Sequence, residues 1–283
     1  MLKKCFKYDF AYVIKIWWLA AISLISVSFG AGWGFRNINI YSNAPNKFFI
    51  LEYVLIVVYI IAAGAFAILT QVLLCTRFYT NFFSDEGYLT FTLPVKRSTL
   101  LCSKVLSGFL CEIMTYFTII SSVIIVTLMI PSQHKEFNNV FYEFIFEFKE
   151  FFFNVPINER IWISVYLIEF LIISILLLLA LCVVLYMLIT LGATLVKKFK
   201  IGAIIGFMVL ADYIYSILFV GSGISFVLWF NAGTYLYGEK LSETNTFFLI
   251  FFVMILISIM ISTVVLLFVN ITQGLINRKL NLQ

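Results

Sequence analysis

Three carboxylic acids interrupt long apolar runs of this sequence, namely Glu112, Glu169 and Asp212. An ionisable side chain in such a run is costly unless it faces the interior of a helical bundle or water. Glu112 and Asp212 fall near the middle of their runs, where they can line a polar path, bind a proton or form an interhelical hydrogen bond. We expect both to face protein and not lipid. Glu169 lies nearer the end of its run, where we expect it to reach water.

Three further acids lie in an aromatic-rich segment, FYEFIFEFKEFFF, at residues 141–153. Glu143, Glu147 and Glu150 are spaced four and three residues apart, which places them on one face of a helix. Most of the other residues are phenylalanine, so the segment predicts an amphipathic helix on a membrane surface or over the end of a bundle. Two roles fit it: a membrane anchor without ligand contact, or a surface that recognises an amphipathic ligand.

The sequence contains no recognisable catalytic or cofactor-binding set. It has no G-x-x-x-x-G-K-[ST] phosphate loop, no H-E-x-x-H zinc motif and no G-x-S-x-G nucleophile motif. The one histidine, His134, stands in a polar loop, and the five cysteines are scattered without a C-x-x-C pair. We therefore expect no bound cofactor, no metal and no enzyme activity in this chain alone.

The composition is that of a membrane protein, because 63% of the residues are hydrophobic and only 12% are charged, against about 25% charged in soluble domains. Apolar runs of about 18 or more residues recur, as membrane-spanning helices require. These runs are too long for barrel strands, and backbone exposed to lipid must satisfy its own hydrogen bonds. The sequence therefore predicts an all-α polytopic membrane protein whose helices form one bundle.

Six spans are expected after a short interfacial helix. Residues 1–10 carry an apolar side chain at every fourth position among lysines, which favours a helix lying in the membrane interface. The fourth apolar run is longer than a bilayer needs, so part of it must project or break. A glycine-rich tract at 221–233 is consistent with a re-entrant hairpin. The approximate spans are residues 11–33, 49–75, 99–130, 161–196, 201–220 and 246–275.

The basic residues predict the orientation in the membrane. With six spans, the N-terminus, residues 76–98, residues 197–200 and the C-terminal tail share one side, while residues 131–160 lie on the other. The first side carries twelve Lys and Arg residues and the other side six, in longer loops. The positive-inside rule makes the first side, with both termini, cytoplasmic and the 131–160 segment extracellular. We attribute the net charge of +5 to this bias and expect no nucleic-acid partner. The twelve are Lys3, Lys4, Lys7, Arg77, Lys96, Arg97, Lys104, Lys197, Lys198, Lys200, Arg278 and Lys279.

A polar break, FFSDEGYLTFTLP at residues 82–94, lies on the expected cytoplasmic side. Residues 77–83 before and within it can form a short helix across the inner membrane surface. Ser84 and Asp85 are good capping residues, and Gly87 permits a tight turn.

The second half of this break offers contacts to a partner. Tyr88 and Leu89 would be available to enter a groove of another protein, and Pro94 enforces an extended exit. Two interpretations fit these residues: a rigid helix that transmits a movement to the spans it joins, or an interfacial turn without a further role.

A family resemblance favours the first interpretation. The run RFYTNFFSDEGYLTFTLPVKRSTLLCSK, residues 77–104, resembles the first cytoplasmic segment of ABC-2-type transporter permeases from Gram-positive bacteria. Its most specific part is the F-S-D-E-G-Y-L-T-x-T-L-P core. The six-span layout, the basic amphipathic N-terminus and the K-L-N-L tail at residues 279–282 are also similar to that family.

The resemblance implies a membrane subunit of an ABC exporter, multi-pass in the bacterial plasma membrane. In that family the subunit pairs with a second permease subunit, identical or different, and with two copies of a cytoplasmic ABC ATPase that bind ATP and magnesium. The segment after the second span is the coupling helix seated on the ATPase. The residues that this assigns to coupling are Phe82, Phe83, Ser84, Asp85, Glu86, Gly87, Tyr88 and Leu89.

The substrate stays open at this stage. Export of a peptide, a lipid or another amphipathic molecule is the first expectation. The alternative is a sensory or antimicrobial-peptide-resistance permease whose external helix recognises the peptide or a lipid. A channel or intramembrane enzyme that works without an ATPase is disfavoured, because no polar stripe runs through several spans and no catalytic set is present. The external interval is longer than in the simplest family members.

Overall fold

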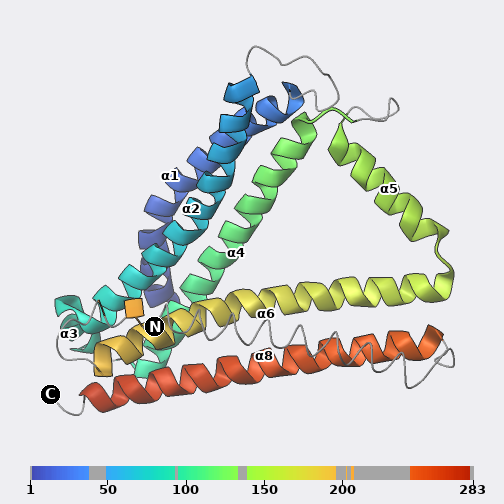
Figure 1. The fold of residues 1–283 in the computed structure, drawn as a ribbon. Helices are drawn as coiled ribbons and strands as arrows, with labels where there is room; N and C mark the ends of the chain where they lie inside the picture. Colours follow the sequence, from blue (N-terminus) through green and yellow to red (C-terminus); the bar gives the residue numbers. More distant parts are fainter. Residues whose placement is uncertain are drawn as a thin grey trace. The chain divides into compact units, whose positions relative to one another are not determined.

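The computed structural model describes residues 2–37, 49–92, 95–132, 139–195, 202, 205–206 and 243–280. Over these ranges the chain is helical and contains no strand, which confirms the all-α prediction. Asp212, His134, Pro94, the tract at 221–233 and most of the expected span at 201–220 lie outside the described residues. The helices are α1 (Leu2–Asn37), α2 (Phe49–Phe83), α3 (Asp85–Thr92), α4 (Arg97–Met129), α5 (Val140–Asn154), α6 (Ile157–Leu195) and α8 (Glu243–Leu280) (Figure 1).

Five of these helices, α1, α2, α4, α6 and α8, are long and apolar enough to cross a membrane. They contain 33 to 39 residues, or about 50 to 58 Å at 1.5 Å per residue, whereas a bilayer's hydrocarbon core is about 30 Å thick. At most 28% of the most apolar 18-residue window in any of them is buried. Large side chains such as Ile61 and Leu266, each 64% exposed, need lipid around them. The described helices are those of a multi-pass membrane protein.

The chain divides into two compact units, which are described separately. The first unit comprises Met1–Thr80 with Cys102–Ile161, and the second comprises Asn81–Leu101 with Trp162–Gln283. In the first unit α1, α2 and α4 run side by side (Figure 1). Its core includes Leu24 and Phe78, both 1% exposed, and the ring of Trp17 lies 5.8 Å from that of Phe66. These large side chains pack between neighbouring helices.

Two glycines let α1 come close to its neighbours in the first unit. A Cβ atom on Gly34 would lie 3.0 Å from the backbone oxygen of Glu52 in α2. A Cβ atom on Gly32 would lie 2.7 Å from the sulfur of Met129 in α4. Small residues at these points allow a backbone approach that a larger side chain would prevent.

In the second unit α6 and α8 lie alongside each other and run in the same direction (Figure 1). Near the start of both helices, the indole of Trp162 packs against Phe248 at 4.8 Å and against Phe251 at 6.1 Å, edge to face. Arg97, at the start of α4, donates a hydrogen bond of 3.5 Å to the side-chain oxygen of Asn277, near the end of α8. These contacts bring the segment before α4 next to the last turns of α8.

The observed helix ends differ from the expected ones in two places. Residues 1–10 are not a separate interfacial helix but continue into the first span as α1. Residues 77–83 are the last turns of α2, and the short helix is instead α3, after Ser84. In both places the chain lacks a proline or glycine that would end a helix at the expected boundary. By contrast, the expected 99–130 span nearly coincides with α4, and the long fourth run is one unbroken helix, α6.

The close approach at Gly34 can be tested by overpacking. We expect Gly34→Leu to destabilise the fold by about 1–3 kcal/mol, because the added side chain must push α1 away from α2. Gly64→Leu is the matched control, since a Cβ atom on Gly64 would meet no atom of the described chain within 4 Å. We expect it to change stability by less than about 0.5 kcal/mol. Reversible unfolding in mixed micelles measures both, and equal effects would contradict the packing described here.

Candidate functional site

The segment with the family resemblance folds as a short helix held against the end of α2. The backbone N–H of Gly87 donates a 2.9 Å hydrogen bond to the carbonyl of Ser84, in the turn between α2 and α3. A Cβ atom on Gly87 would lie 3.0 Å from the carbonyl carbon and oxygen of Phe82. Phe82 itself is buried, and its ring lies 6.4 Å from that of Phe83. A side chain at this position would crowd the last turn of α2, so Gly87 allows α3 to start close against it.

Two polar residues around the start of α3 face solvent. Ser84 and Glu86 are both exposed, and the hydroxyl of Thr90 donates a 2.9 Å hydrogen bond back to the carbonyl of Glu86. The side chains of Asp85, Tyr88 and Leu89 lie outside what the structure describes, although their backbone belongs to α3. α3 is therefore a short helix with the exposed Glu86 in its first turn, and it follows closely after the buried Phe82 of α2.

A buried ion cluster lies at the start of α1 in the first unit. The ammonium of Lys104 in α4 donates to Oδ1 of Asp9 in α1, and Nη2 of Arg77 in α2 lies 3.6 Å from the same oxygen. Asp9 and Lys104 are each only 5% exposed. The Arg77 guanidinium also stacks over the ring of Tyr12, 4.3 Å from its centroid. One carboxylate thus connects three helices, through a charge-assisted hydrogen bond from Lys104 and an ion pair with Arg77.

The sequence analysis counted Arg77 and Lys104 for their charge but did not single out Asp9. A usable signal was present, because Asp9 is an acid among the lysines of the N-terminal segment. Burying an acidic side chain costs more free energy than exposing it, unless a basic side chain pairs with it.

Glu112 lies in the interior of the first unit, where the sequence placed it. It is 4% exposed, and Oε1 of its carboxyl accepts a 2.7 Å hydrogen bond from the side-chain amide of Gln71 in α2. Glu169, in the second unit, is half-buried, and its Oε2 is shielded from solvent without a hydrogen bond to any described atom. That Glu169 reaches water stays a prediction.

Further polar contacts continue along the same face of α4. The indole N–H of Trp17 in α1 donates a 2.9 Å hydrogen bond to the hydroxyl of Thr115, which lies 3.1 Å from the hydroxyl of Thr70 in α2. The hydroxyls of Tyr59 in α2 and Ser122 in α4 lie 3.0 Å apart. Residues three, four, seven or eight positions apart lie on one face of a helix. The contacts of Glu112, Thr115 and Ser122 therefore form a line along the interior of the unit.

Another buried acid was missed by the sequence analysis. Glu52 in α2 is 2% exposed, and its Oε2 accepts no hydrogen bond from the described chain. It lies where the backbone of α2 meets Gly34 of α1. The signal was an acid within the apolar run 49–75, close to its start.

The aromatic segment forms a helix, α5, as predicted. The side chain of Asn139 caps its start by accepting a 3.1 Å hydrogen bond from the backbone N–H of Tyr142, and Glu143 accepts a 2.7 Å hydrogen bond from Ser132. No residue of α5 is buried, and Glu147 and Glu150 are exposed together with most of the phenylalanines.

The end of α5 is fixed to the start of α6. The guanidinium of Arg160 donates hydrogen bonds of 2.5 Å and 3.1 Å to the backbone oxygens of Phe153 and Val155. It also lies over the ring of Phe153, 5.3 Å from its centroid. Carbonyl groups at the end of a helix lack hydrogen-bond donors within the helix, and Arg160 supplies donors to them.

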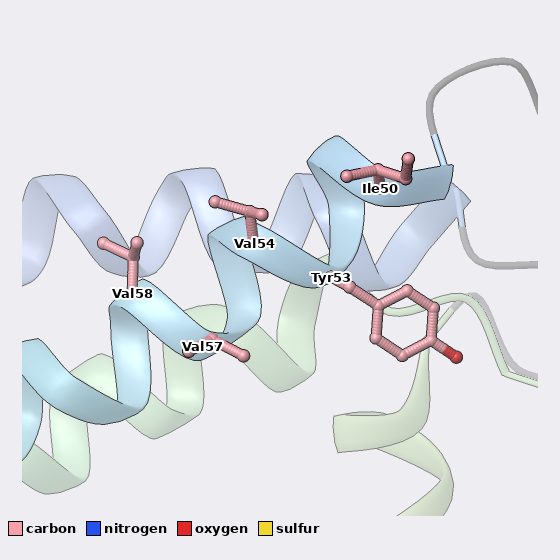
Figure 2. A pocket seen from close by; sticks show the side chains of 5 residues that line it. All are labelled: Ile50, Tyr53, Val54, Val57 and Val58. Carbon is pink, nitrogen blue, oxygen red and sulfur yellow. The ribbon is translucent and has the colours of Figure 1, made fainter.

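A shallow depression of about 320 Å³ lies on one face of α2. Figure 2 shows its lining, Ile50, Tyr53, Val54, Val57 and Val58, all from this single helix. The phenol of Tyr53 is the one polar group among these side chains, so nothing here fixes the orientation of a polar ligand. Its chemistry suits lipid chains. In the described residues no group of three His, Cys, Asp or Glu side chains could hold a metal ion.

Comparison with known proteins adds no assignment. No protein-family model, no curated protein and no solved structure matches this chain.

The ion cluster should contribute strongly to stability. We expect Lys104→Ala to destabilise the fold by about 3–5 kcal/mol, because it leaves the buried Asp9 carboxylate with a weaker set of partners. Lys7→Ala, an exposed lysine on the same N-terminal segment, should change stability by less than about 0.5 kcal/mol. Unfolding in mixed micelles gives both values. A double-mutant cycle with Asp9→Asn then measures the coupling, and additive effects would show that the two charges do not interact.

Proposed function

We propose that this chain is the membrane-spanning permease subunit of an ATP-binding cassette transporter, driven by a separate cytoplasmic ATPase. The observation that carries the proposal is the contact between Gly87 and the last turn of α2. It places α3 close against the end of a membrane-crossing helix, with Ser84 and Glu86 exposed. A force applied to α3 is then passed to α2 and not lost in a flexible loop.

Within each unit, contacts bring helix ends together near this segment. In the first unit, Asp9 near the start of α1 meets Arg77 near the end of α2. In the second unit, Arg97 after α3 meets Asn277 near the end of α8. The side of the membrane on which the sequence places residues 76–98 carries the excess of basic residues, so the positive-inside rule makes it cytoplasmic. An ATPase in the cytoplasm can therefore reach α3.

The direction of α6 and α8 supports a layout of six spans. Both helices run the same way, and both are long enough to cross the membrane. A chain that crosses the membrane twice in the same direction must also cross it once in the opposite direction. With the five described helices this makes six, the number that the resemblance implies.

In this mechanism the chain contributes no nucleotide chemistry of its own. Two copies of the ATPase bind ATP and magnesium and close on hydrolysable nucleotide, and their closure displaces α3. Because α2 and α4 flank α3 in the chain, that displacement changes their tilt relative to a second permease subunit, either a copy of this chain or a different one. The path for the substrate lies between the two permease subunits, and alternate exposure of that path moves a peptide, a lipid or another amphipathic molecule.

A second candidate function is resistance to, or sensing of, antimicrobial peptides. The observation that favours it is the surface of α5, where the exposed carboxylates of Glu147 and Glu150 accompany exposed phenylalanine rings such as Phe144 and Phe151. Cationic amphipathic peptides present the complementary combination of positive charge and apolar side chains. Both candidate functions need the same ATPase, and they differ in what α5 binds.

Co-purification with the ATPase tests the proposal. We expect Glu86→Lys to weaken retention of the ATPase by 10-fold or more, since a charge reversal at the centre of a docking surface costs about 1.4 kcal/mol or more. Glu147→Lys is the matched control, because it makes the same change at an exposed position on α5 and should leave retention unchanged. The quantity to measure is the ratio of ATPase to permease after affinity purification in mild detergent. If Glu86→Lys retains the ATPase as well as Glu147→Lys does, α3 is not the docking helix.

A further inference from the structure

The pair formed by Gln71 and Glu112 leaves one buried acceptor without a donor. The amide nitrogen of Gln71 donates to Oε1 of Glu112 at 2.7 Å. The amide oxygen of Gln71, Oε1, is shielded from solvent and accepts no hydrogen bond from the described chain. A buried amide oxygen without a donor is unfavourable, so the pair lacks one hydrogen atom for full satisfaction.

Exchanging the amide nitrogen and oxygen of Gln71 leads to the same requirement. In that orientation the amide oxygen would lie at hydrogen-bond distance from a carboxylate oxygen of Glu112, and two acceptors would face each other. Such a contact is stable only if the carboxyl group carries a hydrogen atom. Both orientations of the amide therefore call for a proton on Glu112.

The charged groups around Glu112 do not favour a carboxylate. On α4 and α2 the cations Lys104 and Arg77 are engaged with Asp9 of α1, and Lys104 is eight positions from Glu112, about 12 Å along the helix axis. Lys15 of α1 is exposed. The thiols of Cys75 in α2 and Cys111 in α4 are close enough to interact with the carboxyl group, and they bring no positive charge. Among the described residues no ion pair includes Glu112.

We propose that Glu112 and Gln71 form a proton-binding site between α2 and α4, occupied at neutral pH. The carboxylate takes up one proton on Oε2, and the resulting O–H donates to Oε1 of Gln71 while the amide of Gln71 donates to Oε1 of Glu112. This closed pair satisfies every polar atom of the two groups. The proton is released only when the two side chains part, so any movement that separates α2 from α4 is linked to proton release. The site itself does not depend on the transporter function, whereas its link to transport does.

Infrared difference spectroscopy on the full chain in lipid vesicles tests the site. The C=O stretch of a protonated carboxyl group is separate from the carboxylate bands and shifts on exchange into D₂O. We expect a carboxylic-acid band at pH 7 that is lost in Glu112→Gln and kept in Glu147→Gln, which removes an exposed acid on α5. If the spectra of wild type and Glu112→Gln show no difference in this band at pH 7, Glu112 is ionised and the proposal fails.

Stability provides an independent readout. Glutamine at position 112 can form the same two hydrogen bonds with Gln71 as a protonated glutamate, so the unfolding midpoint of Glu112→Gln should equal that of wild type at pH 7. Gln71→Leu should lower the midpoint, because it leaves the Glu112 carboxyl group buried without a partner. A Glu112→Gln variant that fails to fold would overturn the proposal, since a neutral isostere would then not replace the native group. The assay needs no ATPase, so its failure is distinct from failure of the transporter proposal.

Discussion

The first unit depends on the requirement that polar groups buried among apolar helices find partners on one another. Asp9 illustrates the constraint, because it lies in a segment that would otherwise be free to rest on the membrane surface. Its carboxylate meets Lys104 of α4 and Arg77 of α2, and the cost of separating these charges in a medium of low dielectric constant is high. The start of α1 is thereby held inside the unit. The order of the three helices follows from this cluster more than from their apolar contacts, because lipid competes for apolar side chains and not for charges.

The polar contacts farther along α4 extend the same logic. Glu112, Thr115 and Ser122 each meet a side chain of α1 or α2, and each contact constrains the rotation of one helix against another. Interhelical hydrogen bonds in membranes contribute about 0.6–2 kcal/mol each, so their main effect is to select one packing among several of similar energy. A unit built in this way is rigid along its interior and apolar outside. Such a unit can move as a body when one of its helices is pushed from the end.

The sequence predicted the helical class, the positions of most long helices and the amphipathic helix at 141–153, because apolar length and periodicity depend on local composition. It also placed Glu112 in protein and not in lipid. It did not predict the partner Gln71, because which face of α2 meets α4 depends on how the two helices are rotated, and single-sequence patterns do not contain that rotation. Asp9 and Glu52 were missed for a related reason. Each lies near the end of its helix, where an acid looks solvated until a neighbouring helix is brought against it. The end of α2 was also misjudged, because no proline or glycine ends the helix near residue 76 and it continues to Phe83.

The unbroken length of α6 has a consequence for the lipid around this protein. It contains 39 residues, and a straight helix of this length measures about 58 Å. A helix whose apolar stretch exceeds the thickness of the surrounding bilayer accommodates by tilting or by stretching nearby acyl chains. In a bilayer with longer acyl chains α6 would tilt less from the membrane normal, and in a thinner bilayer it would tilt more. The composition of the host bilayer thus becomes a variable that sets the resting inclination of this helix.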